Sequence, residues 1–293
     1  MSSHSIVSLL ACALAPLLPS PRVSSPSVKT LVAKAIDTDG ANFALGNETF
    51  VAAGAKFVRN ANTPNIYDAN HVTAVRARTP RKIDALLAAI DREFQQSNHR
   101  RFDIDYRTPP EFVARLLLEP GYSREDGLLM LLEGELQGPP PRACDIRPVR
   151  TKADWDAFWE LMLMDWTEHH ERQHRVVKDE IAREMWRSKQ YKQPPVQYWM
   201  AYAGERPVAY FNSWEGVDGV GQVEDLFTHP EHRKQGYARA LLHHCVAEAR
   251  KKGAGPIVIA SDPTDTPKNI YAGMGWRPVA ILSKMQRILA DSG

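Results

Sequence analysis

Cysteine is scarce in this sequence of 293 residues. The three cysteines, Cys12, Cys144 and Cys245, are odd in number, lie far apart and form no Cys-x-x-Cys pair. This usage is typical of structural thiols in a reducing compartment, and it provides no framework of disulfides. We therefore expect a cytoplasmic protein.

Long apolar runs are also missing. The apolar run at residues 6–18 is too short to cross a bilayer as a helix, and no later stretch has the character of a transmembrane segment. No Lys or Arg precedes this run, so the basic region of a secretory signal is absent, and export is the less favoured alternative. Because several prolines and serines lie in and just after the run, we predict a poorly ordered tail over residues 1–40.

The sequence has little excess of either charge. Lys and Arg together number 37 and Asp and Glu together number 35, which gives a net charge of +2. Such a chain has no field strong enough to make nucleic acid or an anionic membrane its main partner. We therefore predict neither partner, and the oligomeric state stays open.

Composition and length are those of an ordinary globular protein with two domains. Hydrophobic residues make up 43% and charged residues 25%, which is enough for a core without a disulfide or a metal. The Gly-Pro-Pro-Pro run at residues 138–141 interrupts regular structure, so we predict a linker at 136–144 between a domain at 41–135 and a domain at 145–293. For the first domain the patterns predict strands at 55–59, 101–105 and 128–132 and helices at 80–94 and 110–118.

The second domain changes from helical to strand periodicity and back. Two polar amphipathic helices are predicted at 152–166 and 175–187. Short turns with glycine join the next three strands into an antiparallel meander at 196–202, 207–214 and 222–228. An apolar stripe then predicts a helix at 237–250, followed by a strand at 256–260, a short helix from Pro267 and a strand at 278–285. This is the order of an α/β domain.

The loop between the third strand and the long helix carries the strongest functional signal. Residues 229–236 read His-Pro-Glu-His-Arg-Lys-Gln-Gly. A strand whose loop opens a helix presents free backbone N–H groups, which can hold a phosphate. Gly236 allows the backbone to approach the ligand, Ala238 lets the helix come close, and Arg233 and Lys234 add positive charge. A basic solvated turn is the alternative, but the strand and the amphipathic helix lie on the correct sides of this loop.

Two motifs in this half resemble a known family. Residues 223–230 (Val-Glu-Asp-Leu-Phe-Thr-His-Pro), followed by Arg233-x-x-Gly236-x-Ala238, look like the acetyl-CoA-binding core of the GNAT superfamily of N-acetyltransferases. Residues 267–276 are similar to the next signature of that superfamily, which usually ends in Gly-Phe where this chain has Gly-Trp. The resemblance covers about residues 145–289 and implies an α/β fold, a GNAT-like mixed sheet flanked by helices, with acetyl-CoA as the acyl donor.

The resemblance also implies how the donor is held. The central strands of the family separate at a bulge, and the pantetheine arm pairs there with the backbone like an added strand. In this sequence the matching residues are Leu226, Phe227 and Thr228. Backbone amides of the next loop are expected to hold the pyrophosphate, and the matching positions are Arg233, Lys234, Gln235, Gly236, Tyr237 and Ala238.

Two side chains are expected to move protons. An amine must be neutral to attack a thioester, so a carboxylate at the cleft has to accept its proton, and Glu224 matches a glutamate of the superfamily's polyamine acetyltransferases. Since side chains alternate along a strand, Asp225 is expected on the opposite face. Tyr271 matches the family's frequent tyrosine near the departing thiolate, a general acid. A salt-bridged surface carboxylate and an aromatic packed on the sheet are the alternatives for Glu224 and Tyr271.

A third motif points to different chemistry. Residues 170–174 read His-Glu-Arg-Gln-His, the H-E-x-x-H pattern of zinc proteases, with Glu180 and Glu184 as further ligand candidates. The polar surroundings and the position among the expected substrate-side helices argue against zinc catalysis. We therefore predict no metal site, and expect His170 and His174 to lie on an exposed helix surface or to line a substrate pocket.

The N-terminal half repeats the element order of the C-terminal half. Gly121-Tyr122 matches Gly275-Trp276 at an offset of 275 − 121 = 154 residues. The same offset puts Lys82 at the position of Gly236, and residues 79–83 have no glycine for a cradle. We predict a second, smaller α/β domain that is a degenerate, non-catalytic GNAT-like copy. An unrelated domain with the same element order is the alternative, and the polar segment 62–70 has no assigned chemistry, although it can wall off the substrate cleft.

These patterns together predict an N-acyltransferase. It transfers an acetyl group from acetyl-CoA to a primary amine, on a small molecule or a peptide, by direct attack and without a covalent enzyme intermediate. The alternatives are a non-catalytic acyl-CoA-binding module and a zinc hydrolase that uses His170 and His174. The identity of the acceptor does not follow from the fold.

Overall fold

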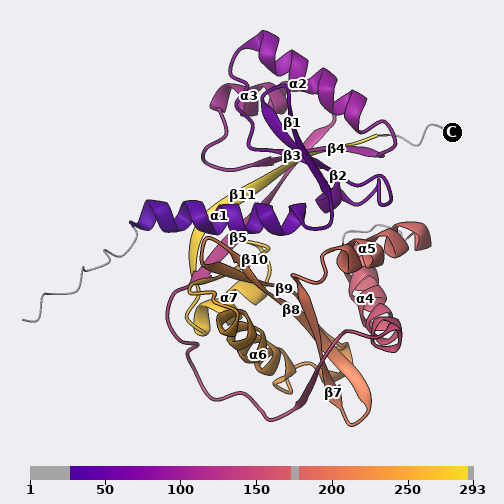
Figure 1. Cartoon of the computed structure of the whole chain (residues 1–293), viewed down its shortest axis with the longest axis vertical. Coiled ribbons are helices and arrows are strands. Elements are labelled where there is room, and N and C mark those ends of the chain that lie inside the picture. The colour runs from indigo at the N-terminus through magenta and orange to yellow at the C-terminus, as the bar shows by residue number, and fades with distance from the viewer. Residues whose placement is uncertain (1–26, 173–177, 290–293) are drawn as a thin grey trace, which may run out of the picture.

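A computed structural model describes residues 27–172 and 178–289 of the chain (Figure 1). The helices of its N-terminal half are α1 (Val28–Ala44), α2 (Pro80–Glu93) and α3 (Pro110–Leu118), with the 3-10 turn η1 (Tyr67–Ala69). The strands of this half are β1 (Glu48–Ala52), β2 (Ala55–Arg59), β3 (His71–Thr73), β4 (His99–Ile104) and β5 (Tyr122–Leu132).

The C-terminal half contains the predicted meander and the helices that follow it. Its helices are α4 (Lys152–Arg172), α5 (Asp179–Tyr191), α6 (Tyr237–Lys251) and α7 (Pro267–Gly273), with the 3-10 turn η2 (Pro230–His232). Its strands are β6 (Asp145–Pro148), β7 (Gln197–Ala203), β8 (Arg206–Val217), β9 (Val220–Thr228), β10 (Ile257–Ser261) and β11 (Arg277–Ile288). The predicted strands at 196–202, 207–214 and 222–228 are confirmed as an antiparallel meander, β7-β8-β9.

The strands of both halves form one sheet. Among the described residues it has 11 strands, in the order β1-β2-β3-β4-β11-β5-β10-β9-β8-β7-β6. The parallel pairs are β3 with β4 and β9 with β10, and the other neighbouring pairs are antiparallel. The predicted fold class, a mixed α/β sheet flanked by helices, is therefore confirmed.

The two halves exchange their last strands. Strand β11 lies between β4 and β5 of the N-terminal half, and β5 lies between β10 and β11 of the C-terminal half. The two exchanged strands pair antiparallel from Arg277↔Leu131 to Arg287↔Tyr122, with one irregularity between Pro278 and Ala280. The linker at 136–144 and the domain boundaries at either side of it stay predictions. One sheet contains strands from both predicted domains, so the strand order does not separate the two domains.

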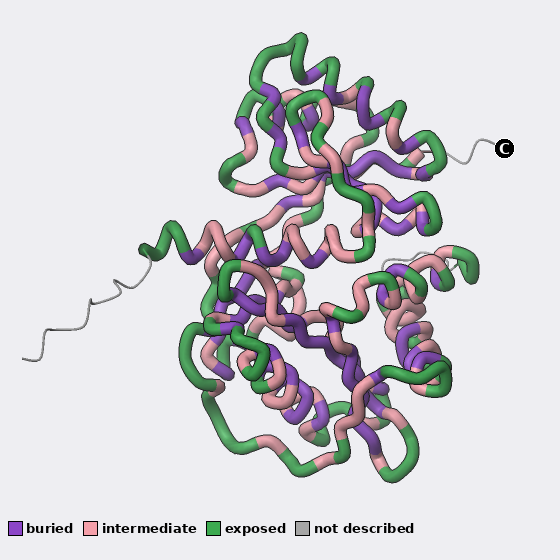
Figure 2. Tube along the Cα trace, in the orientation of Figure 1, coloured by how far each residue is buried: buried purple, intermediate pink, exposed green. Residues whose placement is uncertain are grey.

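Helices cover both faces of this sheet, and side-chain alternation in the strands decides which residues meet them. In β7, Trp199 and Ala201 belong to the apolar core under α6 and α7, while Tyr198 and Met200 face α4. Helix α1 crosses the centre of the molecule and packs on β5, β9 and β10 (Figure 1). Figure 2 shows the strands of this central region buried along most of their length. The interior of the C-terminal half is thus filled from both sides, as expected where parallel strands lie at the centre.

Helix α1 corrects the predicted tail. The prediction of a poorly ordered segment is wrong for residues 28–40, which are helical because Leu31, Ala35 and Ile36 form an apolar stripe that packs on the sheet. The Ser27 hydroxyl accepts a hydrogen bond from the N–H of Thr30 and caps the helix. The apolar run at 6–18 lies outside the described residues. Within 27–172 and 178–289, no helix has both the length and the apolarity needed to span a membrane.

We predict that replacing Leu129 of β5 by Ala will destabilise both halves together. This side chain is fully buried against α1, so its loss should lower the free energy of unfolding by about 2–5 kcal/mol. All seven tryptophans lie in the C-terminal half, so their fluorescence reports on that half, and far-UV circular dichroism reports on the whole chain. Both signals should follow one urea transition with the same lowered midpoint.

Leu118→Ala is the matched control, since Leu118 is 82% exposed and should change stability by less than about 0.5 kcal/mol. Two separate transitions, of which Leu129→Ala moves only one, would show that the exchanged strands do not couple the halves.

Candidate active site

The parallel strands β9 and β10 separate near the middle of the sheet. They pair at Ile257↔Gly221 and Val258↔Gln222, and no further pair follows along the described strands. Beyond this point the side chain of Glu224 bridges the opening, and its Oε1 accepts a hydrogen bond from the N–H of Ala260 at 2.7 Å. A carboxylate therefore lies at the end of the opened cleft.

A bulge in β9 brings a second carboxylate to the same place. Asp225 has a φ of +65°, and the pairing with β8 shifts so that Asp225 and Leu226 together face one residue of that strand. Glu224 and Asp225 consequently line the same cavities. The expectation that Asp225 points to the opposite face is wrong, because the bulge interrupts the strict alternation of side chains.

Glu224 lies in an environment that favours its protonated form. Its Oε1 also accepts a hydrogen bond from Gln222 Nε2 at 3.2 Å, and the same Nε2 lies 3.0 Å from Oδ1 of Asp39 in α1. Burial, followed by the negative charge of Asp39, raises the pKa of Glu224 to about 8. Burial raises the pKa of Asp39 to about 6. Near neutral pH, Glu224 therefore titrates in the range that suits a general base.

The surroundings of Asp225, unlike those of Glu224, favour its charged form. Its Oδ2 accepts a 2.6 Å hydrogen bond from Lys189 Nζ, and Tyr198 Oη and Asn212 Nδ2 each lie 3.3 Å away. Burial acts to raise the pKa of Asp225, but the charges of Lys189 and Lys192 outweigh it and leave the pKa lowered. The two neighbouring carboxylates thus differ, with Asp225 charged and Glu224 able to exchange a proton near neutral pH.

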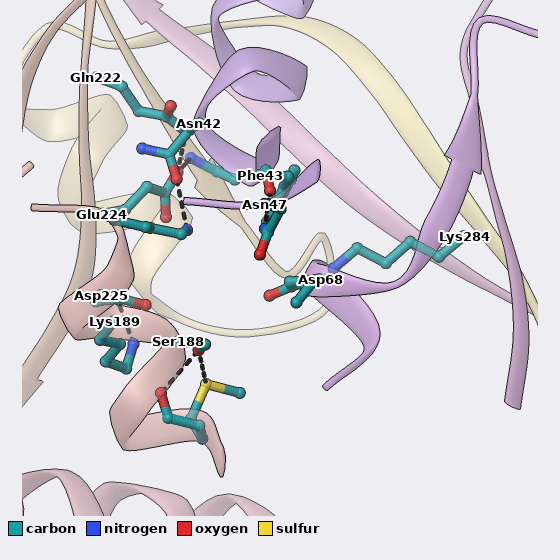
Figure 3. Close-up of a pocket in the computed structure, with 14 residues that line it drawn as sticks. Asn42, Phe43, Asn47, Asp68, Ser188, Lys189, Gln222, Glu224, Asp225 and Lys284 are labelled. Atoms are coloured by element: carbon teal, nitrogen blue, oxygen red, sulfur yellow. Dashed lines mark hydrogen bonds and ion pairs between the residues drawn. The ribbon is translucent and has the colours of Figure 1, made fainter. Parts of the chain in front are cut away.

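Two cavities meet at these carboxylates. The β9–β10 cleft is lined by Leu226, Ala260, Asp262 and Tyr271 among others. On the other side lies a central pocket, whose walls come from α1, η1, α5, β9 and β11 (Figure 3). Glu224, Asp225 and Ala260 belong to both cavities. A group that reaches Glu224 from the central pocket therefore arrives at the end of the β9–β10 cleft.

Tyr271 of α7 lies in the β9–β10 cleft with Glu224. It is 5% exposed, and its ring packs 6.0 Å from that of Trp276. Burial, and then the charge of Glu224, raise the pKa of Tyr271 above its ordinary value. The phenol therefore stays protonated and can donate its proton to a group in the cleft.

The loop before α6 presents backbone N–H groups. Lys234 and Gly236 have φ of +59° and +89°, and Gly236 is the N-cap of α6. Within the described part of the chain, no protein group accepts from the N–H of Lys234, Gln235 or Gly236, and the first turn of a helix leaves its own N–H groups without partners. This alternation of left-handed residues with free amides suits an anion.

The side chains around this loop differ from the expectation in one respect. Arg233 is turned away from the loop, because its guanidinium pairs with Glu168 of α4 and donates to the carbonyl of Thr228. Arg142 from the segment before β6 lies across the loop instead, with its guanidinium 4.3 Å from the centre of the Tyr237 ring and Nη1 donating to the Gln235 carbonyl at 2.9 Å. Sequence patterns contain no signal for Arg142, since it lies about 90 residues before the loop.

The described part of the H-E-x-x-H motif, residues 170–172, lies at the end of α4. His170 lines a lateral pocket, which also contains Tyr67, Trp166 and Lys284, and its Nδ1 lies 2.8 Å from the carbonyl oxygen of Trp166. His174 lies outside the described residues. Glu184 already accepts hydrogen bonds from Asn65 of the N-terminal half.

One cluster of potential metal ligands occurs elsewhere within the described residues. His229, Glu231 and His232 have ligand atoms within 4.8 Å of one another. The guanidinium of Arg206, however, lies 3.0 Å from His229 Nε2, and the N–H of Glu231 faces Nδ1 of the same ring. Both ring nitrogens of His229 therefore already face donors.

Several residues of the site could not be identified from the sequence. Asn42 and Phe43 of α1 line the central pocket, and Asp39 reaches Gln222, because this helix packs over β9 and β10. Lys284 lines the same pocket because β11 inserts next to β4. The polar segment 62–70 also contributes, through Asp68 of the turn η1.

Comparisons with known proteins address the fold of this site. Residues 155–274 match the family model described as Acetyltransferase (GNAT) family. A GCN5-related N-acetyltransferase from Kribbella flavida is 17% identical, with a TM-score of 0.63 over 87% of this chain and 95% of that one. A functionally unknown conserved protein from Staphylococcus epidermidis ATCC 12228 is 14% identical, with a TM-score of 0.62 over 83% and 95%.

Another similar structure has two such domains in one chain. It is a tandem GNAT protein from the clavulanic acid biosynthesis pathway, 13% identical, with a TM-score of 0.51 over 82% of this chain and 79% of that one. At these identities the likeness shows the fold. A search of curated proteins found no match.

We predict that Gly236→Asp will abolish binding of coenzyme A. A Cβ at this position would lie 3.3 Å from Arg142 Cδ, and the added carboxylate would repel a pyrophosphate at the free amides. Gly253→Asp is the matched control, because Gly253 has a φ of +105° at the other end of α6 and no atom within 4 Å of the point that a Cβ would occupy. Calorimetric titration should show binding to the control and none to Gly236→Asp. Equal affinity of both variants for coenzyme A would show that this loop does not bind the cofactor.

Proposed function

We propose that the protein is an acyl-CoA-dependent N-acetyltransferase, because residues 155–274 match the GNAT family model. It transfers an acetyl group from acetyl-CoA to a primary amine by direct attack. The observation that carries this proposal is the meeting of two cavities at Glu224, one of which contains Tyr271. A location in the cytoplasm belongs to the same proposal.

The residues present fit coenzyme A. The separated strands β9 and β10 leave room beside Leu226, which lines the cleft and is followed by Phe227 and Thr228. The N–H groups of Lys234, Gln235 and Gly236 are free at the start of α6, whereas that of Arg233 donates to the Pro230 carbonyl. The pantetheine arm would lie against the first set, and the pyrophosphate against the second. Arg142 adds a positive charge beside this loop. When bound, acetyl-CoA supplies a thioester carbonyl as the electrophile.

Glu224 acts as the general base. The attacking nitrogen must lose a proton as its bond to the carbonyl carbon forms, and Glu224 lies at the boundary between the central pocket and the β9–β10 cleft. Its raised pKa lets it accept this proton near neutral pH. The N–H of Ala260 and Nε2 of Gln222 hold the carboxylate in position.

Tyr271 acts as the general acid. The carbon–sulfur bond breaks as the amide forms, and the sulfur leaves as a thiolate that needs a proton. Tyr271 lies in the β9–β10 cleft and keeps its proton because its pKa is raised. The products are the acetylated amine and free coenzyme A. Glu224 then releases the proton that it took to solvent, and Tyr271 regains a proton from solvent, so both groups return to their starting forms.

The alternative is a binding module that holds acyl-CoA without turnover. Titration with acetyl-CoA, followed by addition of amines in the calorimeter cell, separates the two functions. One-to-one binding with heat of turnover supports the transferase. Binding with no turnover of any amine supports the binding module, and no binding at all contradicts both.

We predict that Glu224→Gln will lower kcat by about 10²–10⁴-fold, the usual contribution of a general base. The amide keeps the hydrogen bond from the N–H of Ala260 but cannot accept the amine proton. The binding of acetyl-CoA should be unchanged in calorimetry. A variant with normal kcat and an unaltered pH–rate profile would place the base elsewhere.

We also predict that Asp39→Asn will shift the acidic limb of the pH–rate profile to lower pH. The negative charge of Asp39 raises the pKa of Glu224, so its removal lowers that pKa and leaves more Glu224 deprotonated at a given pH below about 8. An amide oxygen can still accept from Gln222 Nε2. Profiles of kcat are compared with one amine at saturation, so that the titration of the free amine cancels. An acidic limb at the same pH as in the wild-type enzyme would show that Asp39 does not affect the pKa of the base.

A further inference from the structure

We infer that the acceptor of this transferase is an amine that also carries a carboxylate, and that Lys284 of β11 and Asn42 of α1 bind that carboxylate in the central pocket. This inference rests on the proposed function and names the substrate class of the same site. It is carried by hydrogen-bond donors of the pocket that have no acceptor among the described residues.

Lys284 is the first of these donors. Its side chain lines the central pocket and the lateral pocket, so it lies where the two cavities meet. Within residues 27–172 and 178–289, its Nζ makes no hydrogen bond and no ion pair with a carboxylate. Its close contact is with the ring of Phe43, whose centre is 5.9 Å from Nζ. A half-buried ammonium group of this kind can bind an anion.

The nearby carboxylates have other donors. Asp68 accepts a 2.7 Å hydrogen bond from Arg101, and Asp103 accepts two from the same guanidinium, at 2.6 and 3.1 Å. Asp39 accepts from Gln222. These acids lie close enough to Lys284 to interact with its charge, which explains how an ammonium group is kept inside the fold. They do not provide it with a hydrogen-bond acceptor.

Asn42 is the second donor. It is 4% exposed and lines the central pocket, and its Nδ2 is buried with no hydrogen-bond partner in the described structure. The orientation of its amide is determined, because Oδ1 lies 2.7 Å from Nζ of Lys192, which can only donate. An unsatisfied buried N–H group costs free energy, which an oxygen atom of a ligand can recover.

Charges of both signs line the pocket, and on the β9 side Asp225 is already paired with Lys189. In Figure 3 Glu224 and Asp225 are on one side, and Lys284 extends toward the pocket from the other, beside Asp68. Glu224, which makes no ion pair within the described residues, suits an ammonium or amine group, whereas Lys284 suits an anion. A bifunctional acceptor that has both groups would satisfy both sides, and a simple amine would leave Lys284 and Asn42 without partners.

The lateral pocket suggests the character of the rest of the molecule. It contains the aromatic side chains of Tyr67 and Trp166 and the apolar side chains of Ile181 and Met185. Because Asp68, Met185 and Lys284 also belong to the central pocket, a substituent near the carboxylate can extend into this space. Amino acids with an aromatic or apolar side chain are therefore the first acceptors to examine.

The experiment compares matched acceptors. Phenylalanine, phenylalaninamide and phenethylamine share one aromatic amine and differ in having a carboxylate, a neutral amide or neither. The pair 6-aminohexanoate and pentylamine repeats the comparison with a longer spacing between amine and carboxylate. For the wild-type enzyme, kcat/KM for at least one carboxylate-bearing acceptor should exceed that of its carboxylate-free partner by about 10- to 100-fold, as expected for a charge-assisted hydrogen bond.

Variants of Lys284 then test whether this side chain causes the preference for carboxylate-bearing acceptors. Lys284→Gln should remove this advantage, mainly through KM, and lower kcat/KM for the carboxylate-free amines far less than for their carboxylate-bearing partners, while Lys284→Arg should retain part of the advantage. The inference is overturned if the carboxylate-free amines are the better acceptors, if no carboxylate-bearing amine is acetylated, or if Lys284→Gln lowers activity toward all amines alike. Turnover of simple amines alone would still support the proposed function, whereas no binding of acetyl-CoA would contradict that function itself.

Discussion

The antiparallel pairing of β5 with β11 is the interaction on which the rest of this structure depends. Each of these strands adds to the half of the sheet to which it does not belong in sequence. Neither half therefore has its full set of strands without the other. The pairing brings Lys284 from the C-terminal end of the chain into a pocket with Asp68 of the N-terminal half. It also forms the surface of β5 and β10 on which α1 packs, and this packing carries Asp39 to Gln222 and hence to Glu224. The geometry of the base is thus a consequence of how the two halves are joined.

The bulge at Asp225 is the second constraint, and it has an evident cost. A non-glycine residue with positive φ is strained, although Asp tolerates this conformation better than most residues. The structure compensates with three donors to a single carboxylate oxygen, from Lys189, Tyr198 and Asn212. The result is a pair of adjacent acids with pKa values displaced in opposite directions. Such a separation is a frequent feature of catalytic sites, where one group must stay charged while its neighbour exchanges a proton.

Local patterns predicted much of this fold, because they depend on residues close in sequence. The meander and the helix after the loop follow from periodicity and turn chemistry within short segments, and the predicted base and acid line one cleft. The exchange of β5 and β11 could not be predicted, since it joins residues about 150 positions apart that have ordinary strand patterns. For the same reason no pattern pointed to Asp39, Asn42, Arg142 or Lys284. Asp225 was placed on the wrong face because a bulge changes the alternation that the inference assumed.

The two halves contribute different parts of the candidate site. The N-terminal half repeats the parallel pair as β3 and β4, but α2 begins at Pro80 directly after a short loop without glycine, so it has no equivalent of the amide cradle at Gly236. It contributes walls instead, since α1 and η1 bring Asn42, Phe43 and Asp68 to the central pocket. These side chains lie outside the cleft that contains Tyr271, so they can change without disturbing it. In the proposed reaction the C-terminal half would supply the base and the acid, while the N-terminal half and the exchanged strand β11 would determine which amine reaches Glu224.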